Sequence, residues 1–397
     1  MTVRSPLRHL IALLIAVAAL AALAVALELR ARSGSQPGGA PAELELAAAL
    51  GGGNEAGFLR ATAPRSFVFP ADHGAHDGFR TEWWYVTGNL FAADGRAFGV
   101  QLTFFRNALT ADTVDSPSRW RSSHVWMAHF ALSDQRRGTF HYAERFAREG
   151  AGLAGVSVAP FRVALEDWSL ASRSEADFSP LHLVARDAGL AVDLDLAAGK
   201  PPVLQGDRGL SQKGPEPGNA SYYYSLTRLA TRGTVTVAGE NVAVAGETWL
   251  DREWSTSALG SELAGWDWFA LQLDDGRELM FYRLRRKDGA SDPWSRGSLV
   301  AADGSSHPLL PAAIELDPLS TWTSPSGAIY PARWRLAVPG EALELELTPR
   351  VADQELAVTV RYWEGAMKVT GTSHGRPIAG HGFVELTGYT PARTPQP

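Results

Sequence analysis

Short runs of alternating hydrophobic and polar residues dominate the chain from Phe67 onward, and turn residues separate them. A period of two is typical of β-strands, because successive side chains of a strand point to opposite faces. Helical periodicity is nearly absent, so the crossovers that a parallel sheet needs are not predicted. The pattern predicts an all-β protein, a barrel or a sandwich. The clearest runs are residues 161–165, 190–196, 234–237, 343–347, 356–360 and 367–372.

Two hairpins are predicted from segments that resemble each other. An aromatic run at residues 83–85 leads to Asp-Gly-Arg at 94–96, and a second at 266–269 leads to Asp-Gly-Arg at 275–277. Asp-Gly between alternating runs is the strongest short hairpin signal. Two related hairpins indicate two related β domains, although an antiparallel protein can also contain two similar hairpins by chance.

The N-terminus carries a membrane-targeting pattern. Arg4 and Arg8 precede an uninterrupted apolar run at residues 10–27, which suits either a signal-peptide core or a helix that crosses a bilayer. We therefore predict a signal peptide or signal anchor over residues 1–35. The protein is expected to be exported, to the periplasm or outside the cell, with membrane contact through residues 10–27 if they are not cleaved.

The remaining chain is long enough for two domains. Residues 36–65 are rich in Gly, Ala and Pro and predict a flexible linker. The expected domains cover residues 66–245 and 246–392, with the boundary placed before the second aromatic hairpin.

Composition narrows the class of protein further. The chain has 13 Trp and 16 Phe but no Cys, so aromatic side chains rather than disulfides must stabilise the core or line a cavity. Without residues 1–35, 33 basic residues face 42 acidic ones, a formal net charge of −9. This balance argues against a nucleic-acid partner.

Familiar catalytic motifs are missing. The sequence has no G-x-S-x-G elbow, no H-E-x-x-H helix, no P-loop and no dinucleotide-binding glycine pattern. His73 and His76, and His124 and His129, have spacings that a metal could use, but the first pair lies in a Gly- and Pro-rich loop where histidines mostly cap turns. We predict neither a metal site nor an organic cofactor.

The segment at residues 246–255, GETWLDREWS, places carboxylates and an arginine among indoles. A carboxylate in such surroundings needs a charged partner or favours its protonated form, which is how a protein prepares a proton donor. We assign Asp251 to function. Arg252 and Glu253, with Arg80 and Glu82, are assigned to structural charge pairing.

Three consecutive tyrosines lie just upstream. On a strand, Tyr222 and Tyr224 share one face and Tyr223 takes the other. Two phenols on one face can line a cavity, although buried tyrosines with satisfied hydroxyls are equally common in cores.

Three motifs together resemble the carotenoid 1,2-hydratase family, which includes AttH-like secreted proteins: F-P-x-D-H-x-x-H-x-x-F-R-T-E-W-W-Y-x-T-G-N-L, G-W-D-W-F-x-x-x-L-x-D-G and G-x-V-E-L-T-G-Y. The resemblance runs from Phe67 to Tyr389 and implies two consecutive lipocalin-like β-barrel domains. It also implies a hydrophobic small-molecule ligand, isoprenoid or lipid-like.

The resemblance further implies that Asp251 matches the family's catalytic aspartate. Around it Trp249 replaces a tyrosine, Glu253 an asparagine and Ser255 a glycine, while Tyr222 and Tyr224 correspond to an upstream His-x-Trp pair. The implied reaction is protonation of an alkene by Asp251 and capture of the cation by water. The catalytic candidates are Asp251, Trp249, Tyr222 and Tyr224, and the ligand-binding candidates are Trp83, Trp84, Tyr85, Trp254, Trp266 and Trp268.

Two other functions fit the same sequence. A noncatalytic exported carrier would use the same apolar cavity without turnover. An envelope assembly factor would instead expose an apolar patch.

Overall fold

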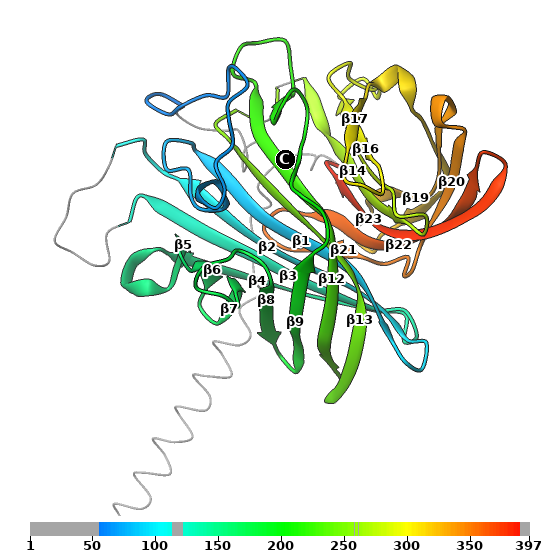
Figure 1. Ribbon diagram of the computed structural model, residues 1–397, viewed down its shortest axis with the longest axis horizontal. Helices are drawn as coiled ribbons and strands as arrows, with labels where there is room; N and C mark the ends of the chain where they lie inside the picture. Colours follow the sequence, from blue (N-terminus) through cyan, green and yellow to red (C-terminus); the bar gives the residue numbers. More distant parts are fainter. Residues whose placement is uncertain (1–54, 113–121, 258, 261, 390–397) are drawn as a thin grey trace, which may run out of the picture. The chain divides into compact units, whose positions relative to one another are not determined.

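The structure is a computed structural model that describes residues 55–112, 122–257, 259–260 and 262–389 (Figure 1). Strands make up nearly all of its regular structure, in two curled antiparallel sheets, and the predicted all-β, lipocalin-like fold is confirmed. The described residues contain no α-helix, and none of their helical turns has the length and hydropathy to cross a membrane. The predicted leader lies outside the described residues. The turns are η1 (Ala71–His73), η2 (Gly150–Gly152), η3 (Pro311–Ala313) and η4 (Pro339–Glu341).

The first sheet has thirteen strands, in the order β4-β3-β2-β1-β13-β12-β9-β8-β7-β6-β5, with β10 and β11 also paired to β12. These strands are β1 (Thr81–Ala92), β2 (Ala97–Ala108), β3 (His124–Asp134), β4 (Thr139–Arg148), β5 (Ala154–Val158), β6 (Phe161–Leu165), β7 (Trp168–Ser172), β8 (Leu181–Asp187), β9 (Leu190–Ala198), β10 (Val203–Leu204), β11 (Leu210–Gln212), β12 (Ala220–Val237) and β13 (Glu240–Ser255).

The second sheet has ten strands, in the order β17-β16-β15-β14-β23-β22-β20-β19-β18, with β21 also paired to β22. These strands are β14 (Leu263–Leu273), β15 (Glu278–Arg286), β16 (Arg296–Val300), β17 (Ser306–Leu309), β18 (Glu315–Thr323), β19 (Ile329–Val338), β20 (Leu343–Pro349), β21 (Glu355–Leu356), β22 (Tyr362–Ser373) and β23 (Arg376–Thr387).

Both predicted hairpins are confirmed. β1 pairs with β2, and β14 with β15, around turns in which Gly95 and Gly276 have φ of 81° and 84°. Glycine adopts this left-handed region without the steric cost that a side chain would add. Each hairpin occupies the same place in its sheet, because β1 also pairs with β13 and β14 also pairs with β23, the last strand of each sheet. The shared topology supports an origin by duplication.

The change from one sheet to the other occurs later than the predicted boundary at residues 245 and 246. Those residues lie inside β13, which pairs with β1 from Val244 to Ser255. The first sheet therefore ends at Ser255 and the second begins at Leu263. The acidic segment at 246–255 belongs to the first sheet because its backbone completes the ladder beside β1.

Two other expectations differ from the structure. The described part of the predicted linker, residues 55–65, is bound to the first sheet: Leu59 N donates to Gly78 O at 2.8 Å, and the Tyr222 hydroxyl donates to Ala63 O at 2.8 Å. Of the predicted run 356–360, only Leu356 is in a strand. Thr359 N instead donates to the Glu144 carboxylate at 3.1 Å. A side-chain acceptor therefore takes the place of the backbone carbonyl that a neighbouring strand would supply. The other predicted runs lie within strands.

Strands near the centre of the first sheet are covered on both faces. Trp84 and Val86 of β1 point into the core enclosed by the first sheet, while Tyr85 packs against residues of the second sheet such as Trp268. The two sheets touch through β1, β2 and β12 of one and β14, β22 and β23 of the other. Polar bonds join them, including Gln272 Nε2 to Thr227 O at 2.8 Å. The alternating faces of β1 therefore serve two different packed layers.

Candidate active site

A pocket of about 310 Å³ lies between the two sheets. Leu109 and Phe146, which form part of its wall, are 58% and 49% exposed, so this end of the pocket reaches the surface. The volume is at the lower end of the range for small-molecule sites, about 300–1,000 Å³. The wall consists of Trp83, Tyr85, Phe105, Asn107, Leu109, Val125, Met127, His129, Phe146, Lys213, Tyr223, Asp251, Glu253, Leu259, Trp266, Trp268, Tyr282, Leu284, Thr359, Val360, Tyr362, Glu385 and Thr387.

Aromatic side chains from the two related hairpins face each other across the pocket. Trp83 and Tyr85 come from β1, and Trp266 and Trp268 from β14. The rings of Tyr85 and Trp268 meet edge to face, with centroids 5.2 Å apart and an interplanar angle of 89°. Such walls suit a flat or apolar ligand and can stabilise a cation over a ring face.

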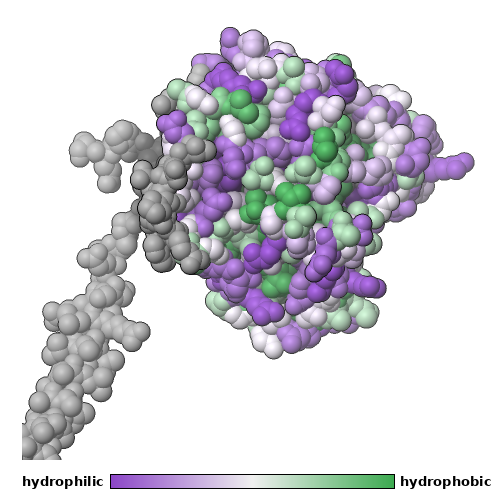
Figure 2. All heavy atoms as spheres, turned by 60° about the vertical axis from the view of Figure 1, so that its left-hand side comes forward, coloured by the Kyte–Doolittle hydropathy of each residue, from purple (hydrophilic) through white to green (hydrophobic). Residues whose placement is uncertain are grey.

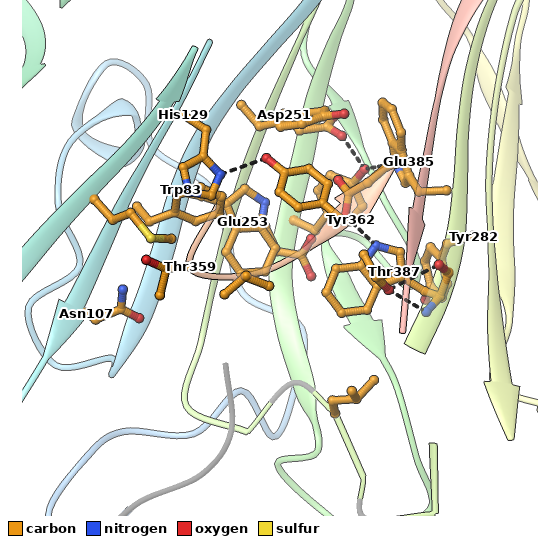
Figure 3. A pocket seen from close by; sticks show the side chains of 18 of the residues that line it. Trp83, Asn107, His129, Asp251, Glu253, Tyr282, Thr359, Tyr362, Glu385 and Thr387 are labelled. Atoms are coloured by element: carbon orange, nitrogen blue, oxygen red, sulfur yellow. Dashed lines mark hydrogen bonds between the residues drawn. The ribbon is translucent and has the colours of Figure 1, made fainter. Parts of the chain in front are cut away.

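Asp251 on β13 is the most distinctive polar group in the pocket (Figure 3). Its Oδ1 accepts hydrogen bonds from Ser225 Oγ at 2.5 Å and from Trp249 Nε1 at 2.6 Å, and its Oδ2 accepts one from the Tyr223 hydroxyl at 2.6 Å. Burial raises the pKa of Asp251 to about 7, the Glu253 charge adds to the rise, and the three hydrogen bonds oppose it. At neutral pH, Asp251 is therefore divided between acid and carboxylate.

The Tyr223 hydroxyl is oriented by a second indole. Trp268 Nε1 donates to the Tyr223 oxygen at 3.2 Å, and an indole N–H can only donate. The tyrosine proton is thus free to point at Asp251. This chain of donors fixes the position of the aspartate without neutralising it.

Three more carboxyl groups lie in or beside the pocket. Glu253 accepts from Ser221 Oγ at 2.5 Å and lies 3.1 Å from Lys213 Nζ through the same oxygen, Oε1. Glu385 accepts from Trp266 Nε1 at 2.9 Å, and burial raises its pKa to about 8. Glu364 is opposite Glu385 in the pairing of β22 with β23. Burial also raises the pKa of Glu364 well above its usual range.

Comparison with known proteins decides the family. The AttH-like family model matches residues 60–389. The chain belongs to the AttH-like family. A Nitrosomonas europaea protein assigned to AttH has 36% sequence identity and a TM-score of 0.72, over 82% of this chain and 99% of the other.

Two hydratases are also similar to this AttH-like protein. Kievitone hydratase of Fusarium solani subsp. phaseoli is 26% identical over 234 residues, which are 56% of this chain and 64%, just under two thirds, of the relative's own length. The structure of kievitone hydratase from Nectria haematococca has a TM-score of 0.63 at 18% identity, over 83% of this chain and 95% of the other. The second likeness shows the fold alone.

The structure places five of the residues predicted to be catalytic or ligand-binding in the wall of the AttH-like pocket: Asp251, Trp83, Tyr85, Trp266 and Trp268. Trp249 stands behind the pocket and holds Asp251 through its indole N–H. The first aromatic run and the acidic segment come together because β1 and β13 are neighbours, with Tyr85 directly opposite Asp251.

The tyrosine pair predicted for catalysis is on the wrong face. Tyr222 and Tyr224 do share a face, but that face packs with Trp254 in a separate cluster. The Tyr224 hydroxyl lies 2.6 Å from His73 Nδ1. Tyr223, which points to the other side, is the tyrosine that contacts Asp251.

Trp84 and Trp254 are also absent from the pocket wall. The Trp84 ring stacks on Trp126 with centroids 5.6 Å apart, and Trp254 stacks on His76 at 3.6 Å. Successive side chains of a strand point to opposite faces. The odd-numbered residues of this part of β1 and β13 line the pocket, whereas Trp84 and Trp254 are even-numbered and pack in the buried clusters on the other face.

Among the residues assigned to charge pairing, Arg252 pairs with Glu82, and Glu253 pairs with Lys213. Arg252 Nη2 lies 3.1 Å from Glu82 Oε2 and donates to Gly74 O at 2.6 Å, which ties the loop before β1 to the sheet. Glu253 cannot join this pair, since it is next to Arg252 on the strand and faces the pocket. For Arg80, the backbone N–H donates to Thr256 Oγ1 at 3.3 Å.

Sequence reasoning missed Lys213, Tyr223 and Glu385. Glu385 lies in the closing motif G-x-V-E-L-T-G-Y. A carboxylate inside this largely apolar motif was the signal that could have identified it. Lys213 lies in the turn between β11 and β12 and carried no such signal. Among the described residues, no group of three His, Asp or Glu is arranged to hold a metal ion.

Proposed function

We propose that this AttH-like protein binds an apolar molecule with a C=C bond in the pocket between its sheets and adds water to that bond. The observation that carries the proposal is Asp251, a buried carboxyl group in an aromatic pocket, whose pKa of about 7 keeps much of it protonated at neutral pH. The name hydratase, borne by a relative that is 26% identical, supports the same reaction class.

The mechanism that fits this geometry is acid-catalysed hydration. The proton of Asp251 Oδ2 passes to one alkene carbon, the π electrons form the new C–H bond, and the other carbon becomes a tertiary cation. The faces of Tyr85, Trp266 and Trp268 stabilise this cation. Water then forms the C–O bond, and its surplus proton returns to the Asp251 carboxylate, so the net reaction consumes one alkene and one water.

The size of the pocket favours a compact substrate. A cavity of about 310 Å³ encloses a small molecule or the end of a long one, rather than a whole carotenoid. We therefore propose a substrate with an isoprenoid-sized alkene group. Incubation with such alkenes in ¹⁸O-labelled water, followed by mass spectrometry, tests the reaction: the expected product has gained one labelled water. Binding without any gain of water would contradict it.

A noncatalytic carrier is the second candidate. The exposed Leu109 and Phe146 at the surface end of the aromatic pocket favour ready entry and release of an apolar ligand. On the face in Figure 2, hydrophobic side chains form small patches among hydrophilic ones, which fits this candidate better than an assembly factor. Both candidates include export, on the basis of residues 10–27.

Hydration is expected to lose rate as pH rises, because Asp251 must be protonated to act. Above pH of about 7, kcat should fall about tenfold for each pH unit. Glu253→Gln removes a charge that raises the pKa of Asp251, so the fall should begin at lower pH. Tyr223→Phe removes a hydrogen bond that lowers this pKa, so the fall should begin at higher pH. The pH profile of kcat measures all three.

The matched control is Tyr222→Phe, which removes a hydroxyl on the opposite face of β12. Its profile should coincide with that of the unaltered protein. A profile that moves with Tyr222→Phe and not with Tyr223→Phe would show that the wrong tyrosine has been assigned to Asp251.

A further inference from the structure

Two exposed hydrophobic side chains form part of the pocket wall, at its surface end. Leu109 follows β2, and Phe146 on β4 is opposite Met127 near the start of β3, so the register places both at the same end of the sheet. Single exposed apolar residues are common on protein surfaces and need no explanation. These two instead continue the apolar wall of one pocket onto the surface. We call the surface end of the pocket at Leu109 and Phe146 its mouth.

The described chain begins beside this mouth. A Cβ atom added to Gly57 would lie 2.9 Å from the Cβ of Ala111, so the two backbones approach closely, and Ala111 is two residues after Leu109. Leu59 O accepts a hydrogen bond from Thr256 Oγ1 at 2.5 Å. Thr256 begins the connection from β13 to β14, which contributes to the pocket wall. The first described residues therefore lie along the mouth.

The sequence upstream of this point carries the predicted membrane segment. Its apolar run ends at residue 27, and residues 28–54 connect it to the first described residue. Even when fully extended, 27 residues span at most about 97 Å. If residues 10–27 cross a bilayer, the chain leads from that bilayer to the mouth. A tether of this kind raises the local concentration of a second binding surface, so that weak contacts suffice for binding.

A lipid bilayer fits this surface better than a second protein does. Stable protein interfaces bury about 800 Å² on each partner, whereas Figure 2 shows only small hydrophobic patches on the face that it presents. Two apolar side chains at the boundary between headgroups and acyl chains give weak, reversible binding, and stable attachment takes a second anchor. Residues 10–27 are suited to be that anchor.

We propose that the mouth of the pocket docks on a lipid bilayer, with Leu109 and Phe146 inserted at the bilayer surface. The pocket then opens toward the acyl chains, and an apolar ligand passes between bilayer and pocket without crossing water. Such a path matters for an apolar molecule, because exposing its surface to water is unfavourable. The docking surface goes beyond the proposed function, and only the nature of the ligand rests on that function.

The contact is apolar and does not depend on charged headgroups. Without residues 1–35 the formal net charge is −9, whereas attraction to anionic lipids requires clusters of Lys and Arg. Insertion of apolar side chains therefore predicts docking on uncharged bilayers, and phosphatidylcholine vesicles are the appropriate probe.

A fluorophore attached to one introduced cysteine tests the docking, because the chain has no Cys of its own. Leu109→Cys places the label at the mouth. Ile329→Cys, at an exposed apolar position of β19 outside the pocket wall, is the matched control. The full chain is reconstituted without ligand in phosphatidylcholine vesicles whose acyl chains carry a nitroxide quencher. We expect the label at position 109 to lose about half of its fluorescence or more, because an interfacial side chain lies about 5–10 Å deep. The label at position 329 should lose little.

Salt separates insertion from attraction between charges. In about 1 M NaCl, where charges are screened beyond about 3 Å, the quenching at position 109 should remain. The inference is overturned by equal quenching at the two positions, by no quenching at position 109, or by loss of that quenching in salt. It is also overturned if the full chain does not stay with the vesicles, because the tether is then absent.

A double variant tests whether Leu109 and Phe146 act as one surface. With the label at Phe146→Cys, the additional substitution Leu109→Glu should reduce quenching at least about fivefold, because a charge resists burial among acyl chains. Ile329→Glu is the matched control and should leave the quenching unchanged. Both substituted positions are exposed, so urea unfolding should give the same midpoint for both variants. Full quenching in a folded Leu109→Glu variant would overturn the assignment of the mouth.

Docking and hydration fail separately, because docking is measured without a ligand. If position 109 is quenched but no alkene gains water, the docking surface is supported and the proposed hydration is wrong. If an alkene is hydrated while position 109 is not quenched, hydration is supported and the docking surface is wrong.

Discussion

Replacing Asp251 with asparagine is expected to lower the rate of hydration by a factor of about 100 to 10,000, the usual contribution of general acid catalysis. An amide cannot protonate an alkene, although it matches the shape of the carboxyl group. Its oxygen can still accept from Ser225 and Trp249. Affinity for the alkene should therefore change little, and comparison of kcat with the dissociation constant measures the two effects.

Glu385→Gln is the matched control for this substitution. It removes the acidity of another pocket carboxyl group, one whose pKa is also raised. We expect less than a tenfold loss in kcat, because Asp251 provides the proton. If Asp251→Asn still hydrates its substrate while Glu385→Gln does not, the acid is Glu385 and the mechanism must be reassigned to the second sheet.

Glu82→Gln is expected to destabilise the fold by about 3–5 kcal/mol, the typical cost of breaking a buried ion pair. Glu82 is fully buried and lies 2.5 Å from Arg106 Nε and 3.1 Å from Arg252 Nη2. The substitution removes the buried carboxylate that two buried guanidinium groups share. Urea unfolding followed by tryptophan fluorescence measures the loss.

An exposed pair provides the comparison for Glu82. Glu344 forms an ion pair with Arg335 at 2.9 Å, and its side chain is 61% exposed. Because water screens such a pair, Glu344→Gln should cost less than about 1 kcal/mol. If the two variants lose similar amounts of unfolding free energy, the buried ion pairs of Glu82 contribute no more to stability than an exposed pair does.

The Glu82 effect should also depend on pH. Burial raises the pKa of Glu82, but the charges of Arg106 and Arg252 and the hydrogen bond from His76 lower it, and the net pKa is below the ordinary value. The stability that Glu82 contributes is therefore present above the ordinary glutamate pKa and is lost as pH falls below it. The difference between the unaltered protein and Glu82→Gln should narrow in acid.

Much of the fold could be predicted from local patterns. The Asp-Gly turns fixed both hairpins, because glycine is needed where the backbone enters the left-handed region. The alternation at 161–165 and 343–347 predicted two strands closely, since alternate residues of each strand, beginning at Phe161 and at Leu343, are buried on one face. The run at 356–360 was misleading because Val358, which lies outside any strand, is buried by packing beside Tyr362 and not by pairing in a sheet.

The candidate site could be predicted only in part. Asp251 was identified because an acid among indoles is unusual in any fold. The choice of Tyr222 and Tyr224 over Tyr223 failed for a definite reason: β12 is buried on both faces, one in the cluster with Trp254 and the other against Trp249 and Trp268. When both faces are apolar, a period of two gives no sign of which one lines the pocket.

The sequence by itself determined that Asp251 lies among indoles, that alternate residues of a strand share one face, and that the two aromatic runs begin related hairpins. Only the tertiary structure decided that these hairpins face each other, that Tyr223 turns toward Asp251, and that Lys213 and Glu385 join the same pocket. The reason is physical: spacing along a strand is set by covalent geometry, whereas the contact between two sheets depends on packing among residues far apart in the chain.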